Sequence, residues 1–221
     1  MTPGAPWLIV TAVEAEAQAV RAGLATGGCT RGSTVAVVGV GSAAAAAGTA
    51  RLLARAEAHG PAYAAVLSAG IGGGFAGRAP TGATVVALRS VAADLGAESA
   101  DGFLPIDDLG FGTSVVTGDG GLAAALRAAL PAALAGDVLT VNTVTGTAAS
   151  AAALAARHPA ALAEAMEGYG VGCAAAGAGL PFGELRTISN PIGPRDRASW
   201  RIGDALAALA SAAAALATVR P

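Results

Sequence analysis

Acidic side chains follow apolar segments of this sequence, in positions where a carboxylate can act on a bound molecule. Glu14 and Glu16 come directly after the apolar run at residues 6–13, and either carboxylate can serve as a base that activates water. Acidic residues are also common in a first helical turn, where they favour the helix dipole. Glu167 lies among small residues, and a carboxylate in such surroundings is costly to bury without partners. Glu164 is interpreted as an exposed charge on a helix.

A glycine-rich stretch and an asparagine mark two further places where apolar runs end. Glycine at residues 70–74 (GIGGG) lets the backbone approach another group closely or adopt a positive φ. The stretch lacks the lysine of a phosphate loop and the following helix of a dinucleotide motif, so by itself it indicates a structural turn. Asn190 precedes a proline, as turn-forming asparagines often do. Arg195, Arg197 and Trp200 follow it closely.

Several other classes of site and partner are not expected. His59 and His158 have no suitably spaced partners, so we expect no metal site, and no motif indicates a cofactor. The net charge is −2 and all 13 cationic residues are arginines without a basic stripe, which disfavours nucleic acid as a partner. No run of large apolar side chains is long enough to span a membrane. Cys29 and Cys173 form no disulfide framework and the amino terminus carries no cationic region, which together favour the cytoplasm.

Short apolar runs alternate with alanine-rich helical stretches along the chain. We expect strands at residues 6–13, 33–40, 64–69, 83–92, 138–144 and 181–189, with a short segment at 162–167. We expect helices from residue 14, at 42–59 with Ser42 as a cap, at 121–134, at 147–157, up to residue 179, and at 199–219. This alternation predicts one α/β domain over residues 1–221, with three layers and a central mixed, mostly parallel sheet flanked by helices. Sites in such folds form at the carboxyl ends of strands, where the acids, the glycines and Asn190 stand.

The order of these features resembles the nucleoside phosphorylase superfamily, particularly the branch that contains methylthioadenosine/S-adenosylhomocysteine nucleosidase. The segments that carry the resemblance are AVEAE at residues 12–16, SAGIGG at 68–73, EAME at 164–167 and RTISN at 186–190. Further segments resemble the futalosine hydrolase family of that branch, namely ADLGAE at 93–98, MEGYG at 166–170 and ISNPIGPRDR at 188–197. The resemblance covers nearly the whole chain and implies a phosphorylase/hydrolase-like fold. It also implies removal of hypoxanthine from futalosine, in an alternative route to menaquinone.

The resemblance implies a role for each acid. Glu16 would activate the water that attacks the anomeric carbon, with Glu14 as the neighbouring alternative. Met166 would pack against the nucleoside, and Glu167 would accept hydrogen bonds from the ribose hydroxyls while positive charge builds on the sugar. The glycine-rich strand end, Gly70, Ile71 and Gly72, would bind the substrate through its backbone.

Asn190 departs from the adenine-type nucleosidases of the superfamily, which carry aspartate at the matching position. An aspartate accepts a hydrogen bond from a 6-amino group, whereas a 6-oxopurine presents an acceptor. The amide of Asn190 offers an NH₂ donor for that oxygen and a carbonyl for a ring N–H. This difference predicts hypoxanthine or guanine as the base, and it removes a carboxyl proton donor to the leaving group.

Phosphate is not expected as the nucleophile. Phosphorylases of the superfamily bind it with two arginines, and here residues 11–14 (TAVE) and Ser68 stand at the matching positions. Water is therefore the expected nucleophile, because a phosphate dianion beside glutamates needs such cations. A methylthioadenosine/S-adenosylhomocysteine nucleosidase, a 6-oxopurine nucleoside phosphorylase and a non-catalytic nucleoside-binding relative remain as alternatives.

The 5′ substituent of futalosine carries a benzoate-type group, for which the resemblance suggests partners. Trp200 would line its pocket, and Arg195 or Arg197 would pair with its carboxylate. Residues 94–111, with Phe103 and Phe111, would reach the site of a neighbouring subunit, so a homo-oligomer acting on a small nucleoside is expected.

Overall fold

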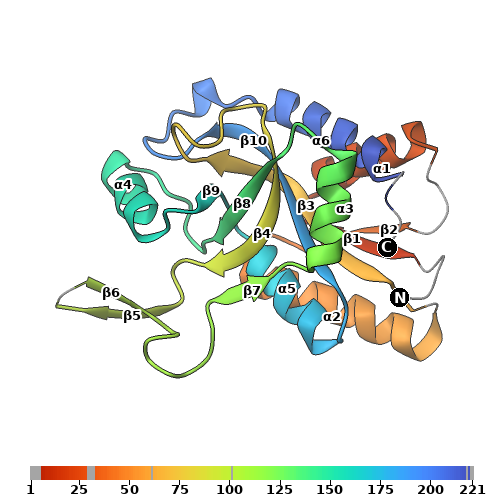
Figure 1. Ribbon diagram of the computed structural model, residues 1–221, viewed down its shortest axis with the longest axis horizontal. Coiled ribbons are helices and arrows are strands. Elements are labelled where there is room, and N and C mark those ends of the chain that lie inside the picture. Colours follow the sequence, from red (N-terminus) through yellow and green to blue (C-terminus); the bar gives the residue numbers. More distant parts are fainter. Residues whose placement is uncertain (1–5, 29–32, 61, 101, 218, 220–221) are drawn as a thin grey trace.

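An eight-stranded mixed sheet forms the centre of the computed structural model, which describes residues 6–28, 33–60, 62–100, 102–217 and 219 (Figure 1). The strands are β1 (Trp7–Thr11), β2 (Ser33–Val37), β3 (Ala65–Gly74), β4 (Thr84–Ala92), β7 (Val115–Thr117), β8 (Leu134–Thr140), β9 (Ala161–Ala165) and β10 (Phe182–Pro191). Their order is β10-β4-β8-β9-β3-β1-β2, with β7 paired to β4. Strand β10 also pairs with β3, so β3, β10, β4, β8 and β9 close into a barrel-like ring.

Most neighbouring strands run parallel, which confirms the predicted mixed, mostly parallel sheet. The pairs β1–β2, β1–β3, β3–β10, β4–β8 and β8–β9 are parallel. The pairs β4–β10, β3–β9 and β4–β7 are antiparallel. The closure of the sheet between β3 and β10 was not predicted, because it joins two strands more than a hundred residues apart.

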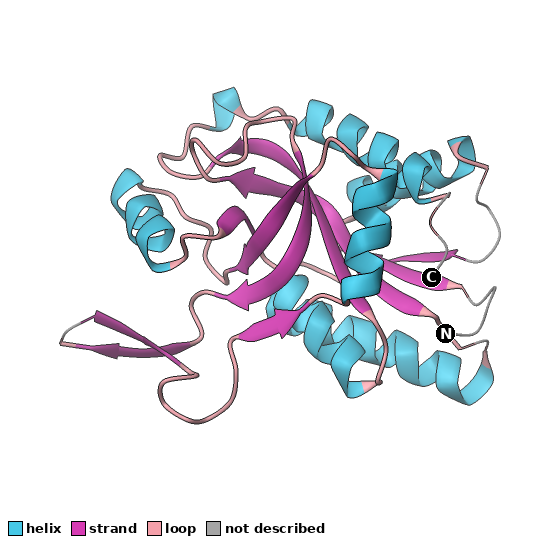
Figure 2. Ribbon diagram, in the orientation of Figure 1, coloured by secondary structure: helices cyan, strands magenta, loops and turns pink. Residues whose placement is uncertain are grey.

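Helices cover both sides of the sheet, as Figure 2 shows. Helices α1 (Glu14–Thr26), α3 (Gly120–Ala129) and α6 (Ile202–Leu216) pack on one side, and α2 (Ser42–His59) and α5 (Gly168–Gly177) on the other. Successive residues of β1 enter the two cores in turn: Leu8 packs with α2 and α5, and Ile9 packs with α1 and α6. Such two-sided burial explains why the strands are apolar throughout.

The alanine and glycine content of the helices lets them approach one another closely. Helices α1 and α6 meet at Gly23, where a Cβ atom would lie 2.0 Å from the carbonyl oxygen of Ala210. Small side chains at such contacts allow backbones to pack without a clash. Small residues at the α1–α6 contact therefore allow these two helices to pack tightly.

The glycine-rich stretch at residues 70–74 continues β3, so the predicted turn there is wrong. None of its residues has a positive φ. Close approach is the reason for glycine: a Cβ on Gly74 would lie 2.1 Å from the carbonyl oxygen of Ala79. Ser42 is likewise the first residue of α2 and not its cap, because Gly41 occupies the capping position with φ 92°.

Two element boundaries also differ from the predictions. The helix expected at residues 121–134 ends at Ala129, since Pro131 disfavours helical conformation in the residue before it. Strand β8 consequently begins at Leu134 and ends at Thr140, which leaves residues 141–147 as a loop ahead of α4 (Ala148–Arg157). That loop reaches the functional site described below.

A β-hairpin extends away from the main body, as Figure 1 shows. Strands β5 (Gly96–Ser99) and β6 (Gly102–Pro105) form it, within residues 94–111, the region expected to reach a neighbouring subunit. Within the described ranges no helix is long and apolar enough to cross a membrane, and no cluster of three potential metal ligands occurs. Cys29 lies outside the described residues.

Candidate active site

A cavity of about 240 Å³ opens where six separate chain segments meet. The β1–α1 turn, the β2–α2 loop, the end of β3, the β8–α4 loop, the β9–α5 turn and the end of β10 with the residues after it all contribute to its lining. The lining residues are Ala12, Val13, Glu16, Val40, 71–73, Val144, Thr145, 164–167, 189–195 and Trp200. The segments that the sequence placed at strand ends therefore converge on one cavity, although they are far apart in the chain.

The carboxylate of Glu16 lies in this cavity, 4% exposed, and accepts three main-chain hydrogen bonds. Its Oε2 accepts from the amides of Ala12 at 3.0 Å and Val13 at 3.3 Å, and its Oε1 accepts from Ile71 at 2.9 Å. Glu16 is the third residue of α1, from which a glutamate reaches back to the free amides that precede the helix. The fold thus fixes this carboxylate in one orientation.

Glu14 lies outside the cavity and serves a different role. Its carboxylate is 57% exposed and forms an ion pair with Arg21 at 2.7 Å. The alternative that the sequence left open between the two acids therefore has a geometric answer: Glu16 lines the cavity and Glu14 faces solvent.

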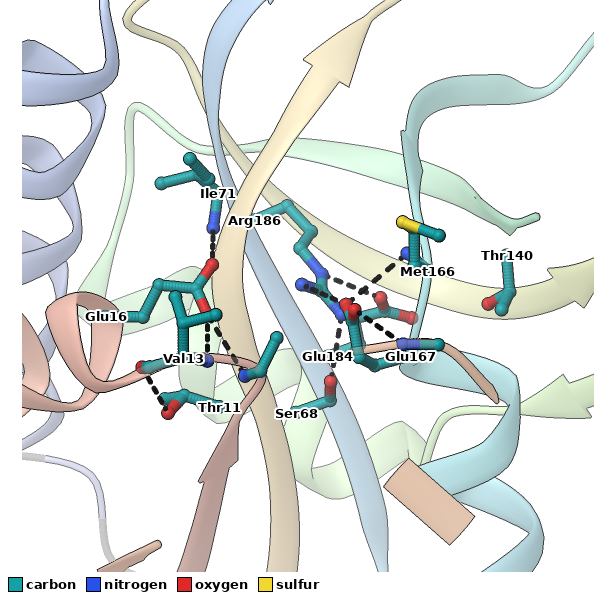
Figure 3. Close-up of polar contacts among 12 residues, drawn as sticks. Thr11, Val13, Glu16, Ser68, Ile71, Thr140, Met166, Glu167, Glu184 and Arg186 are labelled. Carbon is teal, nitrogen blue, oxygen red and sulfur yellow. Dashed lines mark hydrogen bonds and ion pairs between the residues drawn. The ribbon is translucent and has the colours of Figure 1, made fainter. Parts of the chain in front are cut away.

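Beneath the cavity, Arg186 of β10 is fully buried and contacts polar groups on three strands and turns (Figure 3). Its Nη1 lies 3.1 Å from Oε2 of Glu167, its Nε donates to Glu184 at 2.9 Å, and its Nη2 donates to Ser68 at 3.0 Å. A Cβ atom on Gly70 would lie 2.7 Å from Arg186 and 2.6 Å from Glu16. Glycine is required at position 70 because the acid and the arginine occupy the space of a side chain.

The sequence interpretation missed Arg186 and Glu184 as members of the site. A signal was present, since two charges spaced two residues apart in the apolar strand FGELRTIS lie on the same face of that strand. Such a pair inside a buried strand indicates an internal ion pair, because each charge needs a partner there.

Buried groups of opposite charge interact strongly in this network. Burial lowers the pKa of Arg186, but Glu184, Glu167 and Glu16 together raise that pKa above its ordinary value, so the guanidinium stays charged. Burial raises the pKa of Glu184, and the neighbouring Arg186 offsets this only in part. Three carboxyl groups surround one guanidinium, an arrangement that suits a ligand in which positive charge develops.

Glu167 and Met166 lie at the turn between β9 and α5. The Glu167 carboxylate is 5% exposed and accepts from the amides of Gly41 and Met166, both at 3.3 Å, in addition to its contact with Arg186. Met166 is half-buried in the cavity wall beside it. The carboxylate thus lies at the cavity surface, with a charged partner behind it.

Asn190 lines the cavity near the end of β10. Its Oδ1 accepts from the hydroxyl of Ser189 at 2.8 Å, and its Nδ2 donates to the carbonyl oxygen of Pro191 at 3.0 Å. One amide N–H therefore remains available for a ligand.

Glu164 is buried, so its interpretation as an exposed helix charge is wrong. It lies on β9, 6% exposed, and lines the cavity. Its carboxylate accepts from both the amide and the hydroxyl of Thr145, in the β8–α4 loop. Burial raises the pKa of Glu164, and the hydrogen bonds from Thr145 oppose that increase. Helical periodicity could not reveal this position, because the segment is a strand.

An aromatic and cationic rim follows Asn190. Trp200 and Arg195 line the cavity, and the guanidinium groups of Arg195 and Arg197 lie 5.8 and 5.9 Å from the centre of the Trp200 ring. Arg197 contacts Trp200 without lining the cavity. Of the cavity-lining residues in the described part of the chain, Arg195 is the only cation.

Comparison with known proteins identifies the family of this chain. A family model for the phosphorylase superfamily matches residues 12–219. A futalosine hydrolase of Streptomyces coelicolor is 53% identical over 82% of this chain and 77% of its own length. A futalosine hydrolase of Acidothermus cellulolyticus is 48% identical over 95% of this chain and 89% of its own length. The chain belongs to the futalosine hydrolase family of the phosphorylase superfamily.

Solved structures show the same fold at lower sequence identity. A 5′-methylthioadenosine/S-adenosylhomocysteine nucleosidase from Colwellia psychrerythraea, in complex with adenine, has a TM-score of 0.80 and 20% identity. The matched region covers 98% of the chain described here and 96% of the Colwellia nucleosidase chain. A futalosine hydrolase of Helicobacter pylori has a TM-score of 0.76 and 17% identity, covering 96% and 94% of the two chains. The fold of this futalosine hydrolase family member is therefore shared with nucleosidases.

Proposed function

We propose that this protein hydrolyses the N-glycosidic bond of futalosine and releases hypoxanthine and dehypoxanthine futalosine, a step in the futalosine route of menaquinone biosynthesis. The observation that carries the proposal is the carboxylate of Glu16, held by three main-chain amides in a cavity that also contains Glu167 and Asn190. Membership of the futalosine hydrolase family, at about half identity to two named relatives, identifies the substrate. We also propose that residues 1–221 form a single nucleosidase domain.

In this proposal each residue acts on a defined part of the substrate. Glu16 accepts a proton from water as the water oxygen bonds to the anomeric carbon and the carbon–nitrogen bond breaks, with the bonding electrons leaving on the purine. The purine takes up a proton from solvent to become hypoxanthine, and Glu16 returns its proton to solvent. Glu167 accepts hydrogen bonds from the ribose hydroxyls, and Met166 packs against the nucleoside. The negative charge of the surrounding acids stabilises the cationic character of the sugar in the transition state. Asn190 supports the departing ring through its amide N–H.

Hydrolysis is favoured over phosphorolysis by the charges of the cavity. Glu16, Glu164 and Glu167 line it, whereas Arg195, on its rim, is the one cation among its described lining residues. Ser68, at the position where phosphorylases carry an arginine, is buried and accepts from Arg186. A phosphate dianion would meet carboxylates in this cavity without the arginines that hold it in phosphorylases.

The direct test is incubation of the purified protein with futalosine, with and without phosphate, followed by chromatography of the products. We expect free hypoxanthine at the same rate in both reactions. Methylthioadenosine, assayed in parallel, should be cleaved far more slowly. A requirement for phosphate would assign the protein to the phosphorylases. Faster cleavage of methylthioadenosine than of futalosine would assign it to the adenine-type nucleosidases. If no nucleoside is cleaved, the protein has a binding role.

We also propose a homo-oligomer in which the β5–β6 hairpin region of one subunit contacts another. Phe111, just after the hairpin, is 82% exposed, and Leu104 and Leu95 are also exposed. Phe103 is engaged within its own chain, because Arg157 stacks 4.3 Å from the centre of its ring. Phe111→Asp should therefore lower the molecular mass measured by light scattering, whereas an unchanged mass would remove Phe111 from the interface.

A further inference from the structure

Glu164 is a buried acid at the cavity for which the proposed hydrolysis specifies no contact with the substrate. It lies on β9, three residues before Glu167, yet it forms no hydrogen bond or ion pair with Arg186 or Glu16. Its partners are the amide and the hydroxyl of Thr145, in the loop after β8. A carboxylate that is 6% exposed at a cavity wall lowers stability unless it is well satisfied, so its presence there requires an explanation.

The sheet places Glu164 at the same end of the cavity as Asn190. Both residues pair with Gly73 of β3, Glu164 from the β9 side and Asn190 from the β10 side. Two strand spacings separate their backbones by roughly 10 Å. Gly73 carries no side chain between the two residues, and a Cβ there would crowd the Asn190 side, because it would lie 2.9 Å from Ile192 and 3.6 Å from Nδ2 of Asn190.

The two side chains offer complementary hydrogen-bonding groups to a ligand. A carboxylate has about four acceptor positions, and Thr145 uses two of those on Glu164. Asn190 retains one amide N–H, while its Oδ1 already accepts from Ser189. The ligand that matches this pair presents a donor and an acceptor side by side on one edge.

A 6-oxopurine has such an edge, formed by the N1–H donor and the O6 acceptor. We propose that Glu164 accepts the N1–H of the departing base while Asn190 donates to O6, so that Glu164 determines the preference for a 6-oxopurine. The inference rests on the proposed function. A 6-aminopurine has no hydrogen on N1 and directs a lone pair at the carboxylate instead, which leaves both groups without a partner and disfavours binding.

The test compares futalosine with its 6-amino analogue as substrates of the wild-type protein and of Glu164→Gln and Glu164→Leu. Replacing a charged acceptor should lower kcat/KM for futalosine about 10- to 100-fold. The value for the 6-amino analogue should fall much less, or rise, so the ratio of the two values changes. Calorimetric titration with free hypoxanthine and free adenine should show the same loss of preference without turnover.

Thr145→Val is the matched control, because it removes one hydrogen bond to Glu164 but leaves the carboxylate in place. This variant should affect both substrates in equal proportion. If the Glu164 variants also lower both values equally and leave the hypoxanthine-to-adenine affinity ratio unchanged, Glu164 only holds the Thr145 loop and the inference is overturned. Failure of the proposed function is a separate result, since the wild-type protein would then release no hypoxanthine from futalosine.

Discussion

The two ends of the cavity are built in different ways. At the inner end, Glu16 and Glu167 are buried and held by main-chain amides, and Arg186 lies fully buried behind them. At the outer end, Arg195 is exposed, and half-buried Trp200 lies 5.8 Å from the Arg195 guanidinium. The inner groups are therefore oriented by several hydrogen bonds, whereas the outer groups are more open to solvent.

This difference separates the chemistry from the choice of substrate. Groups that stabilise charge in a transition state act best when they do not have to reorganise. Groups that bind a remote substituent contribute mainly to affinity, and such uniform binding alters KM more than kcat. Substitutions at the inner end should accordingly lower turnover, and those at the outer end should weaken binding.

The largest effect is expected for Glu16→Gln, which removes the proposed base. We expect kcat for futalosine to fall about 10²- to 10⁴-fold, as is usual when a positioned base is lost. Glu14→Gln is the matched control, since this neighbour is exposed and its ion pair with Arg21 contributes little. Steady-state kinetics of both variants decide the point, and equal rates in the two would break the assignment of Glu16.

Asn190→Asp should have the next largest effect. The aspartate loses the amide donor for O6 and places a negative charge near that oxygen, so kcat/KM for futalosine should fall about 10- to 100-fold. The kcat/KM for the 6-amino analogue, measured alongside, should fall by a smaller factor. A variant that cleaves futalosine as well as the wild-type protein would show that the amide does not contact the base.

The inner end should also give the protein a pH-dependent stability. Since burial raises the pKa of Glu184 in the folded state above its ordinary value of 4.5, the folded protein binds that proton more tightly than the unfolded chain. The stabilisation is complete below about pH 4.5 and is lost as the pH rises through the raised pKa, at up to about 1.4 kcal/mol per pH unit. Glu184→Gln cannot titrate, so its free energy of unfolding should vary less over that window.

Denaturant unfolding at a series of pH values measures this difference. Arg186 keeps Glu167 as a partner in the Glu184→Gln variant, which should therefore still fold. Parallel stability profiles for the variant and the wild-type protein would mean that Glu184 titrates alike in the folded and unfolded states.

The smallest effect is expected at the rim. Arg195→Ala combined with Arg197→Ala should raise KM for futalosine about threefold to tenfold and leave kcat unchanged, because the loss concerns an exposed pairing with the benzoate-type group. Of the single variants, Arg195→Ala should account for most of the change, since Arg195 lines the cavity and Arg197 does not. An unchanged KM in the double variant would rule out this pairing.

Much of the fold was predictable, because the signals that determine it are local. Periodicity predicted most helices and strands, and the position of strand ends predicted that Glu16, Ile71, Glu167 and Asn190 would converge. Element boundaries failed where a local pattern was overruled. Residues 70–74 continue strand β3 because they pair with β10 and β9, and four of them are glycines because neighbouring groups approach closely.

By itself, the sequence determined the fold class, the family to which the resemblance points and the acids placed at strand ends, since each depends on residue type and spacing along the chain. Only the tertiary structure shows that Glu16 lines the cavity while Glu14 faces solvent, that Glu164 is buried beside Thr145, and that Arg186 contacts Glu184 and Glu167. The physical reason is that burial and ion pairing depend on which distant segments meet. The pairing of β3 with β10 and with β9 brings those segments together, and no local pattern encodes it.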